Sequence, residues 1–334
     1  MRNRRLPASA ASLSVVAATL LLLAPAPAAA QVDAPPPLTP WGVPDLQGIW
    51  SFATLTPMQR PAELADRAVL TEEEAAAYEQ RDADIRSRPN PATFDEDCPE
   101  DFPFCSQAPL AYEFRIWLDR GTTVVSTRRS SLVVDPPDGR IPALTPGVQA
   151  QRDAARAASL RAHGPEDRST VDRCIVGFNA GPPVTPGPYL NHLQVFQSPG
   201  YVALLPEMGD ARIIPTDGRP HGAQRQWRGD SRGRWEGDTL VVETLHARTF
   251  IRDPASPALR LEERFTRAAD GTLLYEVRVD DPTTWTRPWA FEVPMTRSEG
   301  PLYEYACHEG NYAMPNILSA ARAEERAASP QPTR

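Results

Sequence analysis

Three segments hold side chains whose types could perform acid–base chemistry. Residues 303–312 place His308 next to Glu309, and His221 follows a turn at the end of an expected strand. Asp281 lies between two further expected strands. An imidazole near a carboxylate can be oriented and tuned for proton transfer close to neutral pH. The candidate catalytic residues are therefore His308, Glu309, His221 and Asp281, and the alternative for both histidines is a structural hydrogen-bonding role.

Other catalytic chemistries have less support in the sequence. None of the five histidines forms H-x-H or H-E-x-x-H, and the cysteines lack C-x-x-C spacing, so no metal site is expected. Residues 229–233 match G-x-S-x-G around Ser231, but a nucleophile elbow needs a strand, a sharp turn and a helix. A valine-rich strand follows instead, which predicts a hairpin with Ser231 in a polar turn.

Tryptophan and arginine gather in two segments that could bind a ligand. Tryptophan stacks on sugars and aromatic rings, while arginine and aspartate supply hydrogen bonds. The candidate ligand-binding residues are Trp227, Arg232, Trp235, Trp285, Arg287 and Trp289. The alternative is a well-packed corner with an Arg–Asp pair. The expected partner is a small molecule or a carbohydrate.

The chain contains no lysine, because all 35 basic residues are arginine. This excludes a P-loop lysine, a Schiff-base lysine and a pyridoxal-phosphate site. Nucleotide-binding motifs are also missing, so no cofactor is expected. We attribute the arginine bias itself to genomic base composition rather than to function.

The first 30 residues have the layout of a cleavable signal peptide. Arg2, Arg4 and Arg5 precede an apolar stretch that ends in small residues before Gln31. This stretch is short for a transmembrane helix, which needs about 20 apolar residues, so we expect no membrane span after cleavage. The protein is predicted to be periplasmic or secreted, through either Sec or twin-arginine export.

The mature chain is predicted to be acidic. The net charge of the full chain is −8, and it becomes −11 when the three arginines of the signal peptide are removed. Such a charge disfavours binding to nucleic acid and to anionic membranes, so no nucleic-acid partner is expected.

Four cysteines follow the signal peptide. An even number of cysteines in an oxidising compartment favours disulfides. Among the three possible pairings we favour Cys98–Cys105 with Cys174–Cys307.

Turn and strand signals dominate the chain after residue 111. Asp270-Gly271 is the strongest hairpin signal, and the strand after it alternates apolar and polar residues. Strands are expected at 48–50, 132–134, 194–196, 201–205, 211–214, 239–244, 259–267, 272–280, 289–297 and 302–306. Two helices are expected: one at 75–86 after a Thr71/Glu74 capping box, and one from Pro146 to about Ala162.

The consecutive hairpins predict a mainly β fold, either an antiparallel barrel or a sandwich, with two peripheral helices. Gly48-x-Trp50 resembles the first-strand motif of lipocalin-like barrels. The expected organisation has a signal peptide at 1–30, a proline-rich arm, helix and loop at 31–110, a β-rich domain at 111–322 and a disordered tail at 323–334.

Four segments carry long and distinctive motifs: Ser131–Thr145, Trp227–Thr244, Asp281–Trp289 and Tyr303–Tyr312. They resemble a family of secreted bacterial proteins that is usually left uncharacterised, and they cover much of residues 130–325. The resemblance implies a coherent fold and no particular chemistry.

Two functions are compatible with these features. The first is an exported hydrolase or lyase that acts on a small or sugar-like substrate; it requires His308 and Glu309 to share a pocket with His221 or Asp281. The second is a barrel that binds an apolar or aromatic small molecule without catalysis, in a pocket lined by tryptophan. An envelope structural protein is a third, less favoured alternative.

Overall fold

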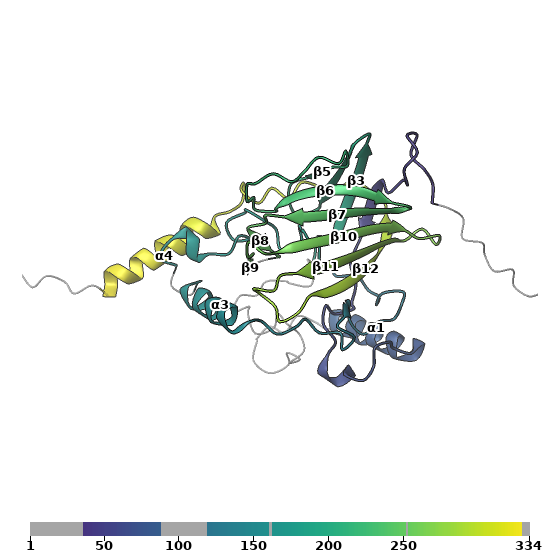
Figure 1. Ribbon diagram of the computed structural model, residues 1–334. Helices are drawn as coiled ribbons and strands as arrows, with labels where there is room; N and C mark the ends of the chain where they lie inside the picture. Colours follow the sequence, from purple (N-terminus) through teal and green to yellow (C-terminus); the bar gives the residue numbers. More distant parts are fainter. Residues whose placement is uncertain (1–35, 88–118, 160–161, 252, 329–334) are drawn as a thin grey trace, which may run out of the picture. The chain divides into compact units, whose positions relative to one another are not determined.

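A computed structural model describes residues 36–87, 119–159, 162–251 and 253–328. These residues form a mainly β fold, as predicted, in which a ten-stranded antiparallel sheet curves into a nearly closed barrel. Figure 1 shows five of its strands, β6, β7, β10, β11 and β12, side by side in this order. Of the two predicted architectures, the structure therefore has the barrel.

The strands reproduce most of the predicted segments. The sheet contains β1 (Gly48–Ser51), β2 (Val133–Asp135), β3 (His192–Ser198), β4 (Tyr201–Pro206), β5 (Arg212–Pro215), β6 (Asp230–Glu236), β7 (Thr239–Leu245), β10 (Arg260–Arg267), β11 (Leu273–Asp280) and β12 (Trp289–Ser298). A separate two-stranded pair consists of β8 (Thr249–Phe250) and β9 (Asp253–Pro254).

The order of the strands leaves a seam in the barrel. Neighbours follow the path β5-β4-β3-β1-β12-β11-β10-β7-β6, with β2 joined to β12 beside it. Every pair on this path is antiparallel, and because the path has an odd number of strands, β5 and β6 at its two ends run in the same direction. An antiparallel ladder therefore cannot close between them. Residues 216–229 instead carry the chain from the end of β5 back to the start of β6.

Alternation along the strands fills the barrel interior. On β11, Leu273, Tyr275, Val277 and Val279 are buried, as the pattern around the Asp270-Gly271 turn predicted. At the seam, Gly233 of β6 lies so close to β5 that an added Cβ would stand 3.1 Å from a side-chain atom of Ile214. Side-chain packing therefore holds β5 and β6 together where no ladder joins them.

Trp50 of β1 belongs to the buried core and contacts the segment that precedes β1. Its side chain is fully buried, and its indole Nε1 donates to the carbonyl of Leu46 over 2.9 Å. The guanidinium groups of Arg267 and Arg297 lie 5.8 and 5.3 Å from its ring. Both groups also donate to backbone carbonyls of the segment before β1, over 2.9 and 2.6 Å. The Gly48-x-Trp50 motif thus anchors the N-terminal segment to the barrel.

Replacing Gly48 with alanine is expected to lower the free energy of unfolding by about 2 kcal/mol. Gly48 has a φ of +129°, a backbone conformation that costs other residues roughly 1–3 kcal/mol. A methyl group there would also overlap the guanidinium of Arg297. Urea unfolding of the variant measures the loss. Gly200→Ala is the control, because Gly200 has a φ of +79° but open space around it; equal losses in both variants would contradict the predicted clash.

Three α-helices lie around the barrel in the described residues, where two were expected. Helix α1 (Glu72–Ser87) begins with the predicted capping box, since Glu74 N donates to Thr71 Oγ1 over 3.1 Å and Thr71 N to Glu74 Oε2 over 2.9 Å. Helix α3 (Pro146–Ser159) starts at the predicted proline. Helix α4 (Ala313–Ala328) was not expected, and its last turns occupy part of the predicted disordered tail. The described residues also contain two short 3-10 helices, Ala62–Leu64 and Pro165–Asp167.

Two local predictions were wrong. Residues 302–306 form no strand but an irregular segment between β12 and the turn at 307–310. Ser231 lies inside β6 rather than in a turn, although the β6–β7 hairpin itself is confirmed. The signal peptide and the pair Cys98–Cys105 lie outside the described residues. Among the described residues, no helix has both the length and the apolar character that a membrane span requires.

Candidate functional site

The seam between β5 and β6 opens into a cavity of about 770 Å³. Because β5 and β6 run in the same direction, both strands begin at the same end of the barrel. Residues 216–229 therefore run back along the seam from the end of β5 to that end of the barrel, where β6 begins. The cavity is lined by Ile175, Asp210–Ile213, Pro215, Arg225–Arg232 and Arg248. Trp227 and Arg232, two of the predicted ligand-binding residues, belong to this lining.

Five arginines and two aspartates line this cavity, which we call the seam cavity. Two of the arginines have carboxylate partners. Arg212 donates from Nη1 and Nη2 to both carboxylate oxygens of Glu263, over 2.6 and 2.9 Å. Arg232 forms an ion pair with Asp230. The charges of these two guanidinium groups are therefore compensated within the protein.

The other three arginines of the seam cavity donate to backbone carbonyls. Arg228 donates to the carbonyls of residues 180, 181 and 210, and Arg225 to those of residues 247 and 255. Arg248 donates to the carbonyl of Arg225 over 3.1 Å. Among the described residues, none of the three forms an ion pair with a carboxylate. They therefore lack a direct carboxylate partner, although the nearby charges of Asp210 and Glu263 partly offset that of Arg228.

Burial makes these arginine charges more costly to the protein. Burial, together with the nearby charge of Arg212, lowers the pKa of Arg228 to about 10. The Nε atoms of Arg212 and Arg225 are buried and have no hydrogen-bond partner in the described part of the chain. A buried donor without a partner costs roughly 1–3 kcal/mol, more if charged. The arginines that line the seam cavity thus carry positive charge, and two of them keep a buried donor without a partner, which favours an anion nearby.

Arg212 connects the seam cavity to the interior of the barrel. Its partner Glu263 is fully buried and also accepts a hydrogen bond from the hydroxyl of Tyr275 over 2.7 Å. The same hydroxyl accepts from the backbone N–H of Val184 over 3.1 Å. Burial alone would lower the pKa of Arg212, but the charge and hydrogen bonds of Glu263 raise it. Burial and the charge of Glu263 also raise the pKa of Tyr275 well above its usual value.

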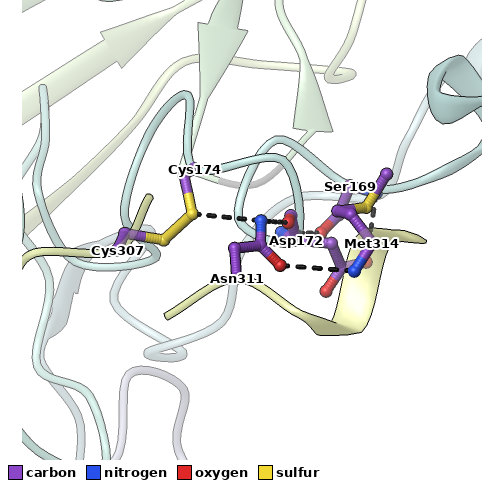
Figure 2. The surroundings of a disulfide bond; sticks show 6 residues. All are labelled: Ser169, Asp172, Cys174, Cys307, Asn311 and Met314. Atoms are coloured by element: carbon purple, nitrogen blue, oxygen red, sulfur yellow. Dashed lines mark hydrogen bonds between the residues drawn. A yellow bond between two sulfur atoms is a disulfide. The ribbon is translucent and has the colours of Figure 1, made fainter. Parts of the chain in front are cut away.

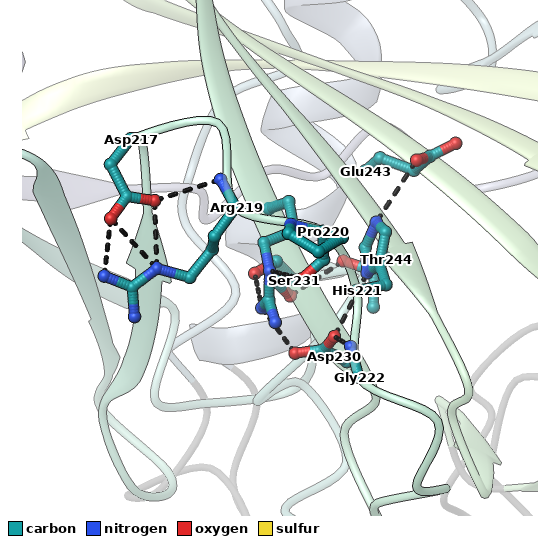
Figure 3. Close-up of polar contacts among 10 residues, drawn as sticks. Asp217, Arg219, Pro220, His221, Gly222, Asp230, Ser231, Glu243 and Thr244 are labelled. Carbon is teal, nitrogen blue, oxygen red and sulfur yellow. Dashed lines mark hydrogen bonds and ion pairs between the residues drawn. The ribbon is translucent and has the colours of Figure 1, made fainter.

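His221 lies between two carboxylates, as Figure 3 shows. Its Nδ1 is 3.2 Å from Asp230 Oδ2, and its Nε2 is 3.2 Å from Glu243 Oε2. Asp230 also accepts from the backbone N–H of Gly222 over 2.7 Å. Since both ring nitrogens contact carboxylates, neither is directed at a substrate. The arrangement ties the crossing segment 216–229 to β6 and β7.

The turn before His221 is held in a similar way. Asp217 Oδ1 accepts from the backbone N–H of Arg219 over 3.2 Å, and hydrogen bonds from Arg219 lower the pKa of Asp217 to about 2. The guanidinium of Arg219 also donates to the hydroxyl of Tyr201 over 2.7 Å. The predicted Asp-Gly-Arg turn is thus a stable connection at the end of β5.

His308 and Glu309 are exposed and line a different, smaller cavity of about 230 Å³. The disulfide Cys174–Cys307, which was the favoured pairing, lies in the lining of this cavity. Figure 2 shows how Asn311 braces it: Asn311 Nδ2 donates to the carbonyl of Asp172 over 2.8 Å. This cavity shares Ile175, Asp210 and Arg228 with the seam cavity, so the two adjoin.

The remaining candidate residues lie in neither cavity. Asp281 is buried; burial would raise its pKa, but hydrogen bonds from Thr284, Thr283 and Ser256 lower it. Its oxygens accept the Thr283 and Thr284 hydroxyls over 2.7 and 2.6 Å, so this carboxylate shapes a turn.

The predicted tryptophan wall is part of the core. Trp285 and Trp289 are 4% and 1% exposed, and their rings are 5.8 Å apart and lie against Phe250. Trp235 packs against the same core, and Arg287 pairs with Asp135 over 3.0 Å at the surface. The alternative of a packed corner with an Arg–Asp pair therefore describes this segment.

The structure separates the four candidate catalytic residues into three places. His308 and Glu309 share a cavity, but neither His221 nor Asp281 lines it. Sequence reasoning missed most of the seam cavity, above all Arg212, Arg225, Arg228 and Arg248. The sequence signal for these residues was the high density of arginines on both sides of Trp227. We overlooked it because we attributed the arginine-rich composition to genomic base composition.

Fold and site together define a meander barrel with an arginine-lined opening at its seam. No protein-family model, curated protein or solved structure matches the chain. The resemblance to a secreted bacterial family stays a prediction.

Proposed function

We propose that this protein is an exported barrel that binds a small organic anion in the seam cavity. The observation that carries the proposal is the set of three arginines, Arg225, Arg228 and Arg248, that line the cavity without a carboxylate partner. The chain as a whole has a net charge of −8, so this local excess of positive charge goes against its composition. A cleft lined with one sign of charge concentrates ligands of the opposite sign.

The chemistry of the side chains supports an anionic ligand. The planar guanidinium presents paired donors that match a carboxylate or a phosphate. An anion beside Arg228 would offset the burial and the repulsion from Arg212 that lower the pKa of Arg228. The seam cavity, at about 770 Å³, is large enough for a drug-sized molecule.

Export is supported by the predicted signal peptide and by the disulfide. A disulfide such as Cys174–Cys307 fits an oxidising compartment outside the cytosol. The proposal keeps the predicted binding barrel and adds an anionic group to the ligand, which was expected to be an apolar or aromatic small molecule. The hydrolase or lyase hypothesis has less support, because the predicted acid–base residues do not share one cavity.

Binding of anions is expected to depend on Arg228. In low salt, where electrostatic attraction is least screened, calorimetric titration of the purified protein with benzoate and with inorganic phosphate should show binding by one or both. Benzylammonium, which is a cation, and glucose, which is uncharged, are the controls and should show no binding in the same titration. Arg228→Gln is expected to weaken anion binding at least tenfold, which corresponds to about 1.4 kcal/mol.

Two further variants keep this experiment decisive. Arg248→Gln alters an exposed residue at the edge of the cavity, so it tests the charge even if Arg228→Gln does not fold. Arg234→Gln is the control, because Arg234 lies on β6 outside the cavity and pairs with Glu236. Equal binding of benzylammonium and benzoate, or unchanged anion binding in both cavity variants, would refute the proposal.

A further inference from the structure

An apolar surface accompanies the arginines of the seam cavity. Ile213 is 57% exposed and Trp227 is 40% exposed, although both are large and apolar. Ile175 and Pro215 belong to the same lining. The cavity therefore offers a charged region and an apolar region to one ligand. Inorganic phosphate or sulfate would use only the first.

The position of Trp227 is held by its backbone rather than by burial of its ring. Its carbonyl accepts from the backbone N–H of Thr249 over 3.2 Å and from the hydroxyl of Thr249 over 2.6 Å. On either side, Gln226 N donates to the carbonyl of His246 over 3.0 Å, and Arg248 N donates to that of Gln226 over 2.8 Å. The backbone that carries this ring is therefore already ordered, which lowers the entropy cost of binding a ligand against it.

Arg248 links the ring of Trp227 to the charged region. Its guanidinium lies 5.7 Å from the centre of the Trp227 ring, and its Nε donates to the carbonyl of Arg225. A guanidinium and an indole both stack on flat aromatic molecules. Trp227, Arg248 and Arg225 thus form a continuous surface that is apolar at one end and cationic at the other.

We propose that the ligand of the seam cavity is an aromatic acid, with its ring on Trp227 and its anionic group on Arg225 and Arg228. This inference rests on the proposed function and deepens it, since it names the class of anion. Arg225 belongs to the cavity lining on the cationic side of this surface, and its buried Nε has no hydrogen-bond partner in the described part of the chain. The carboxylate, sulfonate and phosphate groups of aromatic acids share the chemistry that the arginines recognise.

The test is a series of acids in calorimetric titrations with the purified protein. Acetate, cyclohexanecarboxylate, benzoate and 2-naphthoate keep the carboxylate and vary the apolar part, while benzenesulfonate and phenyl phosphate vary the anionic group. Benzoate should bind at least threefold more tightly than cyclohexanecarboxylate and at least tenfold more tightly than acetate. The last two compounds show which anionic group is preferred.

Trp227→Leu is expected to remove the preference for benzoate over cyclohexanecarboxylate, measured as the ratio of the two dissociation constants in the same variant. Trp41→Leu is the matched control, because Trp41 has a similar exposure of 38% and lies outside the cavity. The control should retain the full preference.

The outcomes separate this inference from the proposed function. If neither the organic acids nor inorganic phosphate bind, both the aromatic inference and the proposed anion site are overturned. If acetate and benzoate bind equally, or if Trp227→Leu keeps the aromatic preference, the aromatic inference is overturned while the anion site stands. A ring preference that Trp227→Leu abolishes and Trp41→Leu retains supports the inference.

Discussion

Replacing Glu263 with glutamine is expected to lower the free energy of unfolding by about 3–5 kcal/mol, the usual loss when one partner of a buried ion pair is removed. Glu263 is fully buried and receives both Nη donors of Arg212 and the hydroxyl of Tyr275. The neutral amide would leave the guanidinium of Arg212 buried without a counter-charge. Guanidinium chloride unfolding, followed by circular dichroism, measures the change in midpoint.

Two further variants identify the cause of that loss. Replacing both charged residues, Arg212→Met with Glu263→Leu, should cost less than Glu263→Gln alone, because no charge is then left unpaired. Tyr275→Phe keeps both charges of the ion pair but removes the hydroxyl that donates to Glu263 and accepts from Val184 N, so it should cost about 1–3 kcal/mol. A wild-type midpoint for Glu263→Gln would show that the ion pair does not hold the barrel together.

Replacing both Cys174 and Cys307 with alanine is expected to cost about 5 kcal/mol of stability. The two cysteines are 133 residues apart. In the chain-entropy model, a cross-link over that separation lowers the conformational entropy of the unfolded chain and so destabilises the unfolded state by about 5 kcal/mol. Variants are preferable to a reducing agent, since the chain holds two more cysteines. Thermal and denaturant unfolding of the double variant measure the loss.

A local control separates the cross-link from the contacts around it. Asn311→Ala removes the hydrogen bonds that Asn311 Nδ2 donates to the carbonyl of Asp172 and to Cys174 Sγ, and the bond that Met314 N donates to Asn311 Oδ1, but it keeps the disulfide. This variant should cost about 1 kcal/mol. If it costs as much as the double cysteine variant, the stability comes from the packed contacts at this point and not from the covalent link.

Apart from the barrel and the pairing Cys174–Cys307, the predictions that succeeded concern short stretches of chain. The hairpin at Asp270-Gly271, the strand that follows it and the capping box at Thr71 and Glu74 were all confirmed. Each depends on turn chemistry, alternation or capping within a few residues, which the sequence displays directly. The strand expected at 302–306 was wrong, since pairing depends on whether the tertiary structure brings a segment beside a sheet edge, which neighbouring residues do not show.

The candidate site shows the same limit more sharply. Trp285 and Trp227 both stand beside arginines and aspartates in the sequence, yet Trp285 is buried in the core while Trp227 lines the seam cavity. His221 was expected beside a carboxylate and has two, but they occupy both of its nitrogens. Residue type indicated what these side chains could do, and burial decided which of them can meet a ligand.

The sequence by itself determined the type of fold, the hairpins, two of the three described helices and the absence of lysine chemistry, because each depends on composition or on neighbours along the chain. Only the tertiary structure decided where the barrel stays open. An odd number of antiparallel strands leaves β5 and β6 parallel and unpaired, and this is a property of the whole sheet that no single segment carries. That seam, together with the segment that crosses it, brings Arg225, Arg228 and Arg248 around one cavity.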